Sequence, residues 1–505
     1  MRDTPNIPFL PNQIILFGHP HRLKLMLEGQ SGGDEKQKPQ PEAETPRPIP
    51  LRLLARKRFR LQIPSEREQG ILPDLPQPEL RELRLYRFEE DEARWIEVLK
   101  QRGQRLQDVI IERNYVVHAI PWTGAGSPWT GAGSPWTGAG SPWTGAGSPW
   151  TGAGSPWAAG GSPWTVGSKP WLEMQDAGGE FIRKRAEAVF INQWAFGSNG
   201  IDWQAKLTRR EPTSEDGEGV MVGVFDTSPF PVPFTSVTID MPPAPLTLSL
   251  KHPIPGGSPG ACGGFAANHG LFVAGLIHAL APAAEIQLIR VLDDTAQGNL
   301  YTLVASLYEF LGQLENKHAV INLSLGFMGS DVPGEEDWDG PDLLRDALSR
   351  ANQQNAVIVA AAGNENAMSD DDLPAMFPAR WDFVLGVAAS DSKKQRACFS
   401  NRGDVLAPGG AGLKHCLPPV GRCHDDDCPY TIISLNVASY TGYGYGIGTS
   451  FAAPLAAGLA ARLQAQLEEI ATGVPLDQPG ARSKAVLTLM KKAAQANDGV
   501  IQAPI

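Results

Sequence analysis

The sequence predicts an α/β fold, a doubly wound parallel sheet, for the C-terminal part of the chain, residues 172–505. Strand-like and helix-like segments alternate there, which is the pattern of βαβ units with helices on both faces of a sheet. The strand segments are short apolar runs without polar alternation, as in strands that are buried on both faces. Such a sheet buries a large core, so we expect the domain to need no disulfide for stability.

The expected strands span residues 220–225, 286–291, 319–325, 356–361 and 383–387. The expected helices span residues 269–280, 300–314, 343–352 and 450–467. Open α/β sheets place their sites at the carboxyl ends of the strands, so polar residues at the ends of these elements are the candidates for chemistry.

One serine, Ser450, stands at the predicted start of the last helix, in the segment GTSFAAP. Serine is a poor nucleophile unless a base takes its proton. At a helix N-terminus after glycine it is exposed, and the surrounding backbone N–H groups can face a developing negative charge. The segment alone is also consistent with an N-cap on a buried helix, so three segments upstream decide between the two interpretations.

These three segments each present one polar residue next to an apolar element. Asp226 ends the apolar run 219–225, His269 opens a helix, and Asn364 follows the strand 356–361. Singly, each has a structural explanation as a cap or a turn. Together, in the order Asp, His, Asn, Ser, they supply an orienting acid, a general base, an oxyanion donor and a nucleophile.

The motifs that carry these residues resemble those of the subtilisin-like serine peptidases, the subtilase family (peptidase S8). VGVFDTS, HGLFVAG, AAGN and GTSFAAP are similar to the four family motifs that contain the acid, base, oxyanion donor and nucleophile. INLSLG at 321–326 and the segment 399–409 are similar to two supporting motifs. The resemblance covers the chain from about residue 185 to about residue 495.

The motifs depart from the family pattern at three positions. The family usually has His-Gly-Thr-His-Val-Ala-Gly where this chain has Leu271 and Phe272 at the two inner positions, and Phe451 stands in place of Met. All four chemical groups remain. We therefore expect the departures to affect fine geometry and pH response rather than the chemistry.

The resemblance implies a subtilisin-like fold and a serine endopeptidase that works through an acyl-enzyme on polypeptide substrates. It implies that substrate lies extended along Ser324, Leu325 and Gly326. No cofactor is required for this chemistry. Structural calcium is common in the family, but no metal ligand is assigned in this sequence. Asp370–Asp372 follow Asn364, where the resemblance places part of the specificity pocket, so a preference for basic residues competes with a solvated acidic loop.

Ahead of this region the sequence divides into three parts. Residues 1–50 are rich in proline and polar residues and predict a flexible arm. Residues 51–120 predict a small α+β domain, with strands at 51–63 and 109–118 and an amphipathic helix at 89–101. This domain resembles the inhibitory propeptide and intramolecular chaperone of the family, and the alternative is an unrelated small domain.

Residues 121–171 form a linker in which Pro-Trp-Thr-Gly-Ala-Gly-Ser repeats every seven residues. Regular proline and glycine block a helix and weaken a sheet, which favours a spacer. The alternative is an aromatic ladder that stacks on sugars or a wall polymer. The aromatic ladder suggests an alternative to the peptidase: a catalytically silent binding protein with the subtilase fold that uses the repeat.

Composition limits the partners and the compartment. The net charge of −11 argues against nucleic acid. No apolar stretch is long enough for a transmembrane segment, and the N-terminus lacks the pattern of a signal peptide, which slightly favours the cytoplasm over secretion.

Of five cysteines, Cys416, Cys423 and Cys428 cluster near two histidines, so a disulfide, unpaired thiols and a zinc site compete. Cys262 and Cys398 are expected to be isolated small residues.

Overall fold

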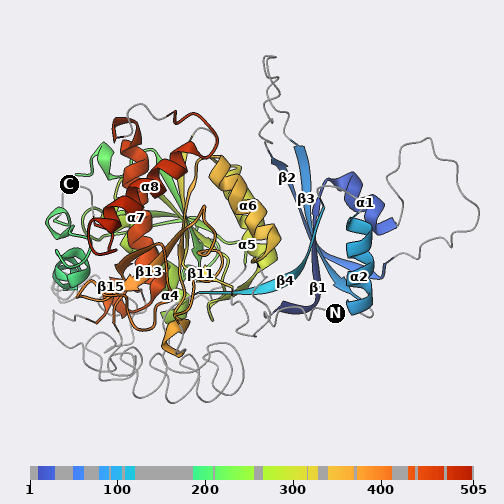
Figure 1. Ribbon diagram of the computed structural model, residues 1–505, viewed down its shortest axis with the longest axis horizontal. Helices are drawn as coiled ribbons and strands as arrows, with labels where there is room; N and C mark the ends of the chain where they lie inside the picture. The colour runs from blue at the N-terminus through green and yellow to red at the C-terminus, as the bar shows by residue number, and fades with distance from the viewer. Residues whose placement is uncertain are drawn as a thin grey trace, which may run out of the picture. The chain divides into compact units, whose positions relative to one another are not determined.

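The computed structural model describes residues 9–28, 49–61, 79–89, 92–104, 109–119, 186–208, 211–254, 265–314, 317–327, 339–368, 372–411, 430–437, 442–470 and 475–502 (Figure 1). The chain forms two compact units. The first consists of Met1–Val116, Asn299–Glu315 and Gly329–Leu348, and the second of Val117–Gly298, Asn316–Met328 and Ser349–Ile505. The linker repeat and the cysteine cluster lie outside the described residues.

An eight-stranded sheet forms the centre of the second unit, in the order β14-β13-β12-β10-β5-β8-β7-β6. All neighbouring strands are parallel except β6 and β7, so the predicted doubly wound parallel sheet is confirmed. The strands are β5 (Val220–Asp226), β6 (Ser236–Ile239), β7 (Leu246–Lys251), β8 (Glu285–Arg290), β10 (His318–Leu323), β12 (Val357–Ala361), β13 (Leu385–Ser390) and β14 (Val405–Pro408).

Strand β5 lies where the strand order reverses. The chain runs from β5 through β6 and β7 to β8 on one side, and then crosses to β10 on the other side of β5. Ligands in open α/β sheets bind outside the carboxyl ends of the strands at such a switch point. Asp226, the last residue of β5, stands at this position.

Two long helices, α4 (Phe265–Leu280) and α7 (Thr449–Ile470), pack against each other in the second unit, and α8 (Ala481–Gln495) packs on α7 (Figure 1). Small residues make the close approach of α4 and α7 feasible: a Cβ on Gly458 would lie 2.8 Å from the Cβ of Leu280. Helix α6 (Asp342–Gln353) precedes β12. None of the described helices is long and apolar enough to cross a membrane.

Shorter elements complete the second unit. A hairpin of β15 (Ile432–Leu435) and β16 (Tyr443–Gly446) precedes α7. Two short strands, β9 (Gln297–Asn299) and β11 (Leu325–Gly326), pair with the last strand of the N-terminal region. The 3-10 turns are η3 (Trp194–Phe196), η4 (Gln204–Lys206), η5 (Ser214–Asp216) and η6 (Glu365–Met368).

The first unit is built on an antiparallel sheet in the order β4-β1-β3-β2. Its strands are β1 (Phe9–Gly18), β2 (Leu51–Leu61), β3 (Glu79–Phe88) and β4 (Ile110–Ala119), and its helices are α1 (Pro20–Glu28), α2 (Glu92–Gly103) and α5 (Leu300–Leu311). Side chains of β1, β3, α1 and α2 form one core, with Leu16, Leu23 and Leu99 fully buried.

The predicted flexible arm over residues 1–50 is wrong for residues 9–28, because β1 lies between β3 and β4 inside the sheet. The reason is the apolar run from Ile14 to Phe17, in which every side chain is almost completely buried. Four apolar residues suffice for a central strand once partners exist on both sides, and the nearby prolines hide this in the sequence.

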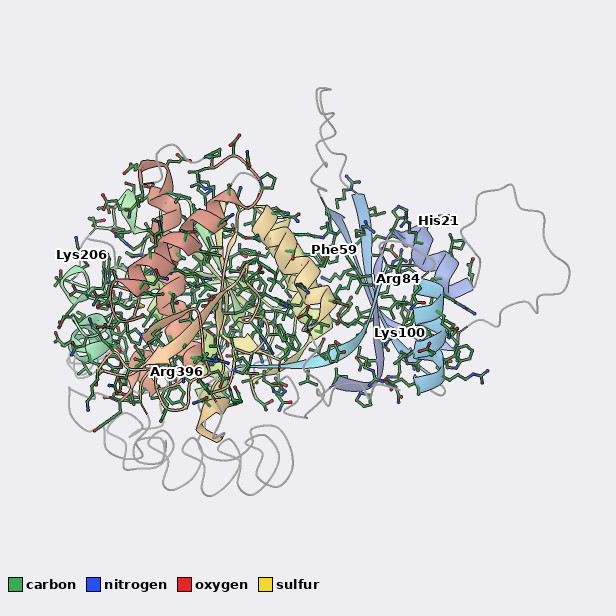
Figure 2. The ribbon with its side chains drawn as sticks, viewed as in Figure 1. His21, Phe59, Arg84, Lys100, Lys206 and Arg396 are labelled. Carbon is green, nitrogen blue, oxygen red and sulfur yellow. The ribbon has the colours of Figure 1, made fainter. Side chains whose placement is uncertain are left out.

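The second face of this sheet packs on α5. The ring of Tyr308 lies 5.2 Å from that of Phe17 and 5.0 Å from that of Phe59, which is labelled in Figure 2. The Tyr308 hydroxyl donates to Asp346 at 2.6 Å, and Lys57 forms an ion pair with Glu309. The compact first unit therefore includes helices that lie far along the chain.

Most predicted elements are present with shifted ends, and two shifts concern the site. The predicted strand 319–325 is two strands, β10 and β11, with a break at Ser324. The predicted helix start at His269 is wrong, because α4 begins at Phe265 and places His269 in its second turn. The helix-forming residues Ala266 and Ala267 extend the helix upstream.

Candidate active site

Asp226 holds the imidazole of His269 at the carboxyl end of β5. The His269 Nδ1 lies 2.8 Å from Oδ1 and 2.9 Å from Oδ2 of Asp226, and both side chains are fully buried. The backbone N–H of Thr227 donates to the same carboxylate at 2.6 Å. The carboxylate is thereby fixed from two sides, so it determines which way the imidazole faces.

Helix α4 reaches the strand end because Gly270 follows the histidine. A Cβ at Gly270 would lie 2.2 Å from the carbonyl oxygen of Thr227 and 2.8 Å from the Cβ of Asp226. The Gly270 N–H also donates to the Thr227 hydroxyl at 3.1 Å. This close contact between helix and strand places the preceding residue, His269, opposite Asp226.

Ser450 is the second residue of α7, which begins after Gly448, and the φ of 142° at Gly448 is in the region that favours glycine. Its hydroxyl donates to the carbonyl oxygen of Ser324 at 3.2 Å, and the Ser324 hydroxyl donates to the Ser450 carbonyl at 2.9 Å. The Asn322 amide donates to the Ser324 hydroxyl at 3.0 Å. The break between β10 and β11 thus holds the start of α7 by a reciprocal pair of hydrogen bonds.

The Nε2 atom of His269 is buried and has no hydrogen-bond partner among the described residues. The Ser450 hydroxyl points instead to Ser324, so the hydrogen bond between nucleophile and base is not formed in this arrangement. Catalytic hydrogen bonds are often absent or long without substrate and tighten when it binds.

The side chain of Asn364 is oriented by the residue that precedes Ser450. Its Oδ1 accepts from both the backbone N–H and the hydroxyl of Thr449, each at 3.0 Å. The donor end of the amide, Nδ2, is therefore turned away from Thr449. An amide donor next to the N–H groups of a helix start suits a developing negative charge.

Asn401 stabilises the turn after β12 by hydrogen bonds. Its Oδ1 accepts from the N–H groups of Glu365 at 3.0 Å and Asn366 at 2.9 Å, and its Nδ2 donates to Glu365 at 3.0 Å. Gly363 has a φ of 114°, and a Cβ there would lie 2.6 Å from the Asn401 amide. The network fixes the backbone that carries Asn364.

Strand β11, in which the sequence placed the substrate-binding residues Leu325 and Gly326, is paired with β4. The antiparallel register joins Leu325 to Ala119 and Gly326 to His118. The Ala119 N–H donates to the carbonyl oxygen of Ala296 at 3.1 Å, on the other side of the strand. Residues 118–119 therefore occupy the edge of β11 in extended conformation.

The structure brings together Asp226 with His269, Asn364 with the start of α7, and Ser450 with Ser324. Asp372 forms an ion pair with Arg396 (labelled in Figure 2), and its Oδ2 lies 3.6 Å from Nε of Arg402. Asp370 and Asp371 lie outside the described residues.

Three residues with a clear structural task at the site were not found in the sequence: Thr449, Asn322 and Asn401. Thr449 had a signal, since a threonine at a helix start is a common cap. The two asparagines lie in the segments 321–326 and 399–409 that resemble family motifs, but no pattern assigned their hydrogen bonds. Within the described residues no group of three or more His, Cys, Asp or Glu side chains forms a metal site.

One cysteine differs from expectation. Cys398, which the sequence suggested was an isolated small residue, is disulfide-bonded. The remaining cysteines lie outside the described residues. Distance along the chain does not reveal which thiols meet, so the sequence alone could not identify this bond.

Comparison with known proteins gives consistent matches. The model of the Subtilase family matches residues 217–499. Subtilisin E of Bacillus subtilis (strain 168) is 33% identical over 163 residues, which are 30% of this chain and 39% of that protein. The Minor extracellular protease Epr of the same strain is 30% identical over 154 residues, which are 28% of this chain and 21% of that protein.

A solved structure, the crystal structure of a cold adapted subtilisin-like serine proteinase, is also similar. It has a TM-score of 0.40 and 22% sequence identity, and the match covers 62% of this chain and 98% of that chain. The chain spans less than half of the length of Subtilisin E and of Epr.

Proposed function

Because the chain belongs to the subtilase family, we propose that it is a serine endopeptidase that hydrolyses peptide bonds through an acyl-enzyme. The single observation that carries the proposal is the buried pairing of His269 Nδ1 with both carboxylate oxygens of Asp226, at 2.8 and 2.9 Å. This pairing favours the tautomer that leaves Nε2 as the proton acceptor.

In the proposed reaction Ser450 attacks the scissile carbonyl carbon while His269 takes the hydroxyl proton. Asp226 keeps the resulting imidazolium in place. The Asn364 amide and the backbone N–H of Ser450 stabilise the oxyanion. His269 then gives its proton to the leaving amine, and water completes the cycle by hydrolysing the acyl-enzyme.

Activity is tested with a fluorophosphonate probe, which forms a covalent bond to an activated serine with loss of fluoride. We expect the full chain to be labelled at Ser450 and the Ser450→Ala variant to remain unlabelled. Peptide mapping of the labelled site is the readout. Absence of labelling in a folded full chain would favour the alternative, a catalytically silent binding protein that uses the tryptophan repeat.

We also propose that the N-terminal region is an inhibitor and folding aid of the second half of the chain. Two observations support this. Residues 118–119 pair with β11, the strand along which substrate would lie. In addition, β4 side chains cap two helices: Glu112 accepts from the N–H groups of Asp342 and Leu343 at 2.9 and 2.8 Å, and Asn114 accepts from the Tyr301 N–H at 3.0 Å.

These caps give the inhibitor proposal a specific test in the full chain. Each removed cap is expected to cost about 1 kcal/mol. At about pH 5, where the buried Glu112 carboxyl still stabilises docking, Glu112→Ala and Asn114→Ala should therefore raise the rate of probe labelling, because the strand on β11 is released more often. Glu97→Ala, an exposed change on α2, is the matched control and should leave the rate unchanged. Equal rates in all four proteins would contradict the inhibitor role.

The compartment stays a proposal. The sequence slightly favours the cytoplasm, but the disulfide at Cys398 is typical of oxidising compartments and points to export. Non-reducing mass spectrometry of the natural protein decides between them: a reduced Cys398 would support the cytoplasm, and a disulfide-linked peptide would support export.

A further inference from the structure

The two family motifs that depart from their usual pattern meet in space. Phe272, three residues after the active-site histidine, and Phe451, directly after the serine, have ring centroids 4.5 Å apart at an angle of 50°. Both side chains are fully buried. Substitutions in two distant motifs therefore form one contact, which neither motif predicts by itself.

The ring of Phe451 also faces His269. Their centroids lie 5.3 Å apart, with the planes inclined by 49°. The imidazole is thus held by Asp226 at its Nδ1 edge and flanked by an aromatic ring. Phe272 packs on that ring, so it limits how far the ring can move.

A glycine makes room for this arrangement. A Cβ at Gly446, in β16, would lie 2.6 Å from Cε2 and 2.8 Å from Cζ of Phe451, and the three nearest atoms to it all belong to Phe451. Gly446 does not have a positive φ, so its backbone conformation would accept a side chain. Only the contact with Phe451 would oppose one. Gly446, Phe272 and His269 together surround Phe451.

We propose that Phe451, supported by Phe272 and given space by Gly446, is a positioning residue that holds the His269 imidazole in the orientation needed for proton transfer. The inference rests on the proposed peptidase function. Methionine at this position would be more flexible, since it has three rotatable bonds and adapts to irregular gaps. The Phe451–Phe272 pair is thus more rigid than a methionine would be. A group added next to Phe451 should therefore displace it as a whole.

The proposal predicts a specific rescue. Gly446→Ala should push the Phe451 ring toward His269 and lower kcat by about 10-fold to 100-fold with little change in KM, because small misplacements of catalytic groups have effects of this size. Phe451→Met alone should lower kcat less. In the double variant the flexible side chain should yield to the new methyl group, so kcat should return to the level of Phe451→Met.

Gly458→Ala is the matched control. It also introduces a close contact between α4 and α7, 2.8 Å from the Cβ of Leu280, but none of its three nearest atoms belongs to Phe451. Phe451→Met should not rescue any loss caused by Gly458→Ala. Thermal unfolding of all variants separates loss of fold from loss of positioning.

A second readout does not depend on activity. In full-chain protein with ¹⁵N-labelled histidine, the His269 ring signals, assigned by their loss in His269→Ala, should shift in Gly446→Ala and return toward the Phe451→Met position in the double variant. Unlabelled wild-type protein in the probe assay would refute the peptidase proposal, while the ring signals would still test the packing. Equal effects of Phe451→Met in the Gly446→Ala and Gly458→Ala backgrounds, or unmoved ring signals, would overturn the inference.

Discussion

We expect the residue that pairs with Gly326, His118, to make the occupancy of β11 dependent on pH. Burial lowers the pKa of His118 from 6.5 to about 3. The His118 imidazole is therefore neutral while the strand is paired with β11, whereas in a released strand it would bind a proton below pH 6.5. Since the pKa is depressed in the docked state, the pairing has its full stability above pH 6.5 and loses it progressively as the pH falls toward 3.

The magnitude follows from the difference in pKa. Each pH unit below 6.5 costs the docked state about 1.4 kcal/mol, so at about pH 5 the loss is about 2 kcal/mol, or about 30-fold in the released fraction. A second group acts in the opposite direction. Burial raises the pKa of Glu112 to about 8, so its contribution to docking is lost as the pH rises from 4.5 through 8.

The assay is the rate of fluorophosphonate labelling of the full chain between about pH 7.5 and about pH 5. His118→Leu, which fills the buried site but does not titrate, is the reference. The ratio of the wild-type rate to the variant rate removes the effect of Glu112, which both proteins share, and should rise by up to about 30-fold on acidification. A ratio that stays constant across this range would refute the reasoning.

Four further predictions concern the site and the linker. Ser450→Ala should abolish peptide hydrolysis without lowering the thermal midpoint, and Asn364→Leu should raise the barrier by about 3 kcal/mol, the magnitude known for the side-chain oxyanion donor of subtilisin itself. Thr449→Val should reduce kcat by a smaller factor, worth about 1 kcal/mol, because it removes one of two donors that orient Asn364. Deleting two or three copies of the repeat in 121–171 should leave labelling and its pH response unchanged, since doubling a flexible loop costs only about 0.6 kcal/mol; a large loss of activity would indicate a structured or binding element.

Three of the four residues with chemical roles could be predicted because each lies at or beside the end of a regular element, whereas His269 lies in the second turn of α4. Asp226 closes an apolar strand, Asn364 follows another, and Ser450 opens a helix after a glycine. These positions are encoded locally, by the change from an apolar run to a polar or small residue. Parallel strands then bring the ends together at one edge of the sheet, whatever the distance along the chain.

The parts that could not be predicted depend on partners from elsewhere. Strand β1 is a central strand only because β3 and β4 flank it, and its apolar run 14–17 is short by itself. The break at Ser324 exists because the start of α7 binds there, and not because of a local turn signal. Hydrogen bonds between distant segments decide such features, and a sequence pattern does not contain them.

The hydrogen bond of Ser450 lies beside the strand that substrate would use. The Ser450 hydroxyl donates to the carbonyl oxygen of Ser324, and Ser324 immediately precedes the two β11 residues that pair with β4. In an antiparallel pair, backbone carbonyls that face the partner accept its N–H groups. We therefore expect a substrate that extends along β11 by one more residue to donate to the Ser324 carbonyl and compete with the Ser450 hydroxyl for it. The displaced hydroxyl would then find its acceptor in the buried Nε2 of His269, so that substrate binding itself forms the nucleophile–base pair.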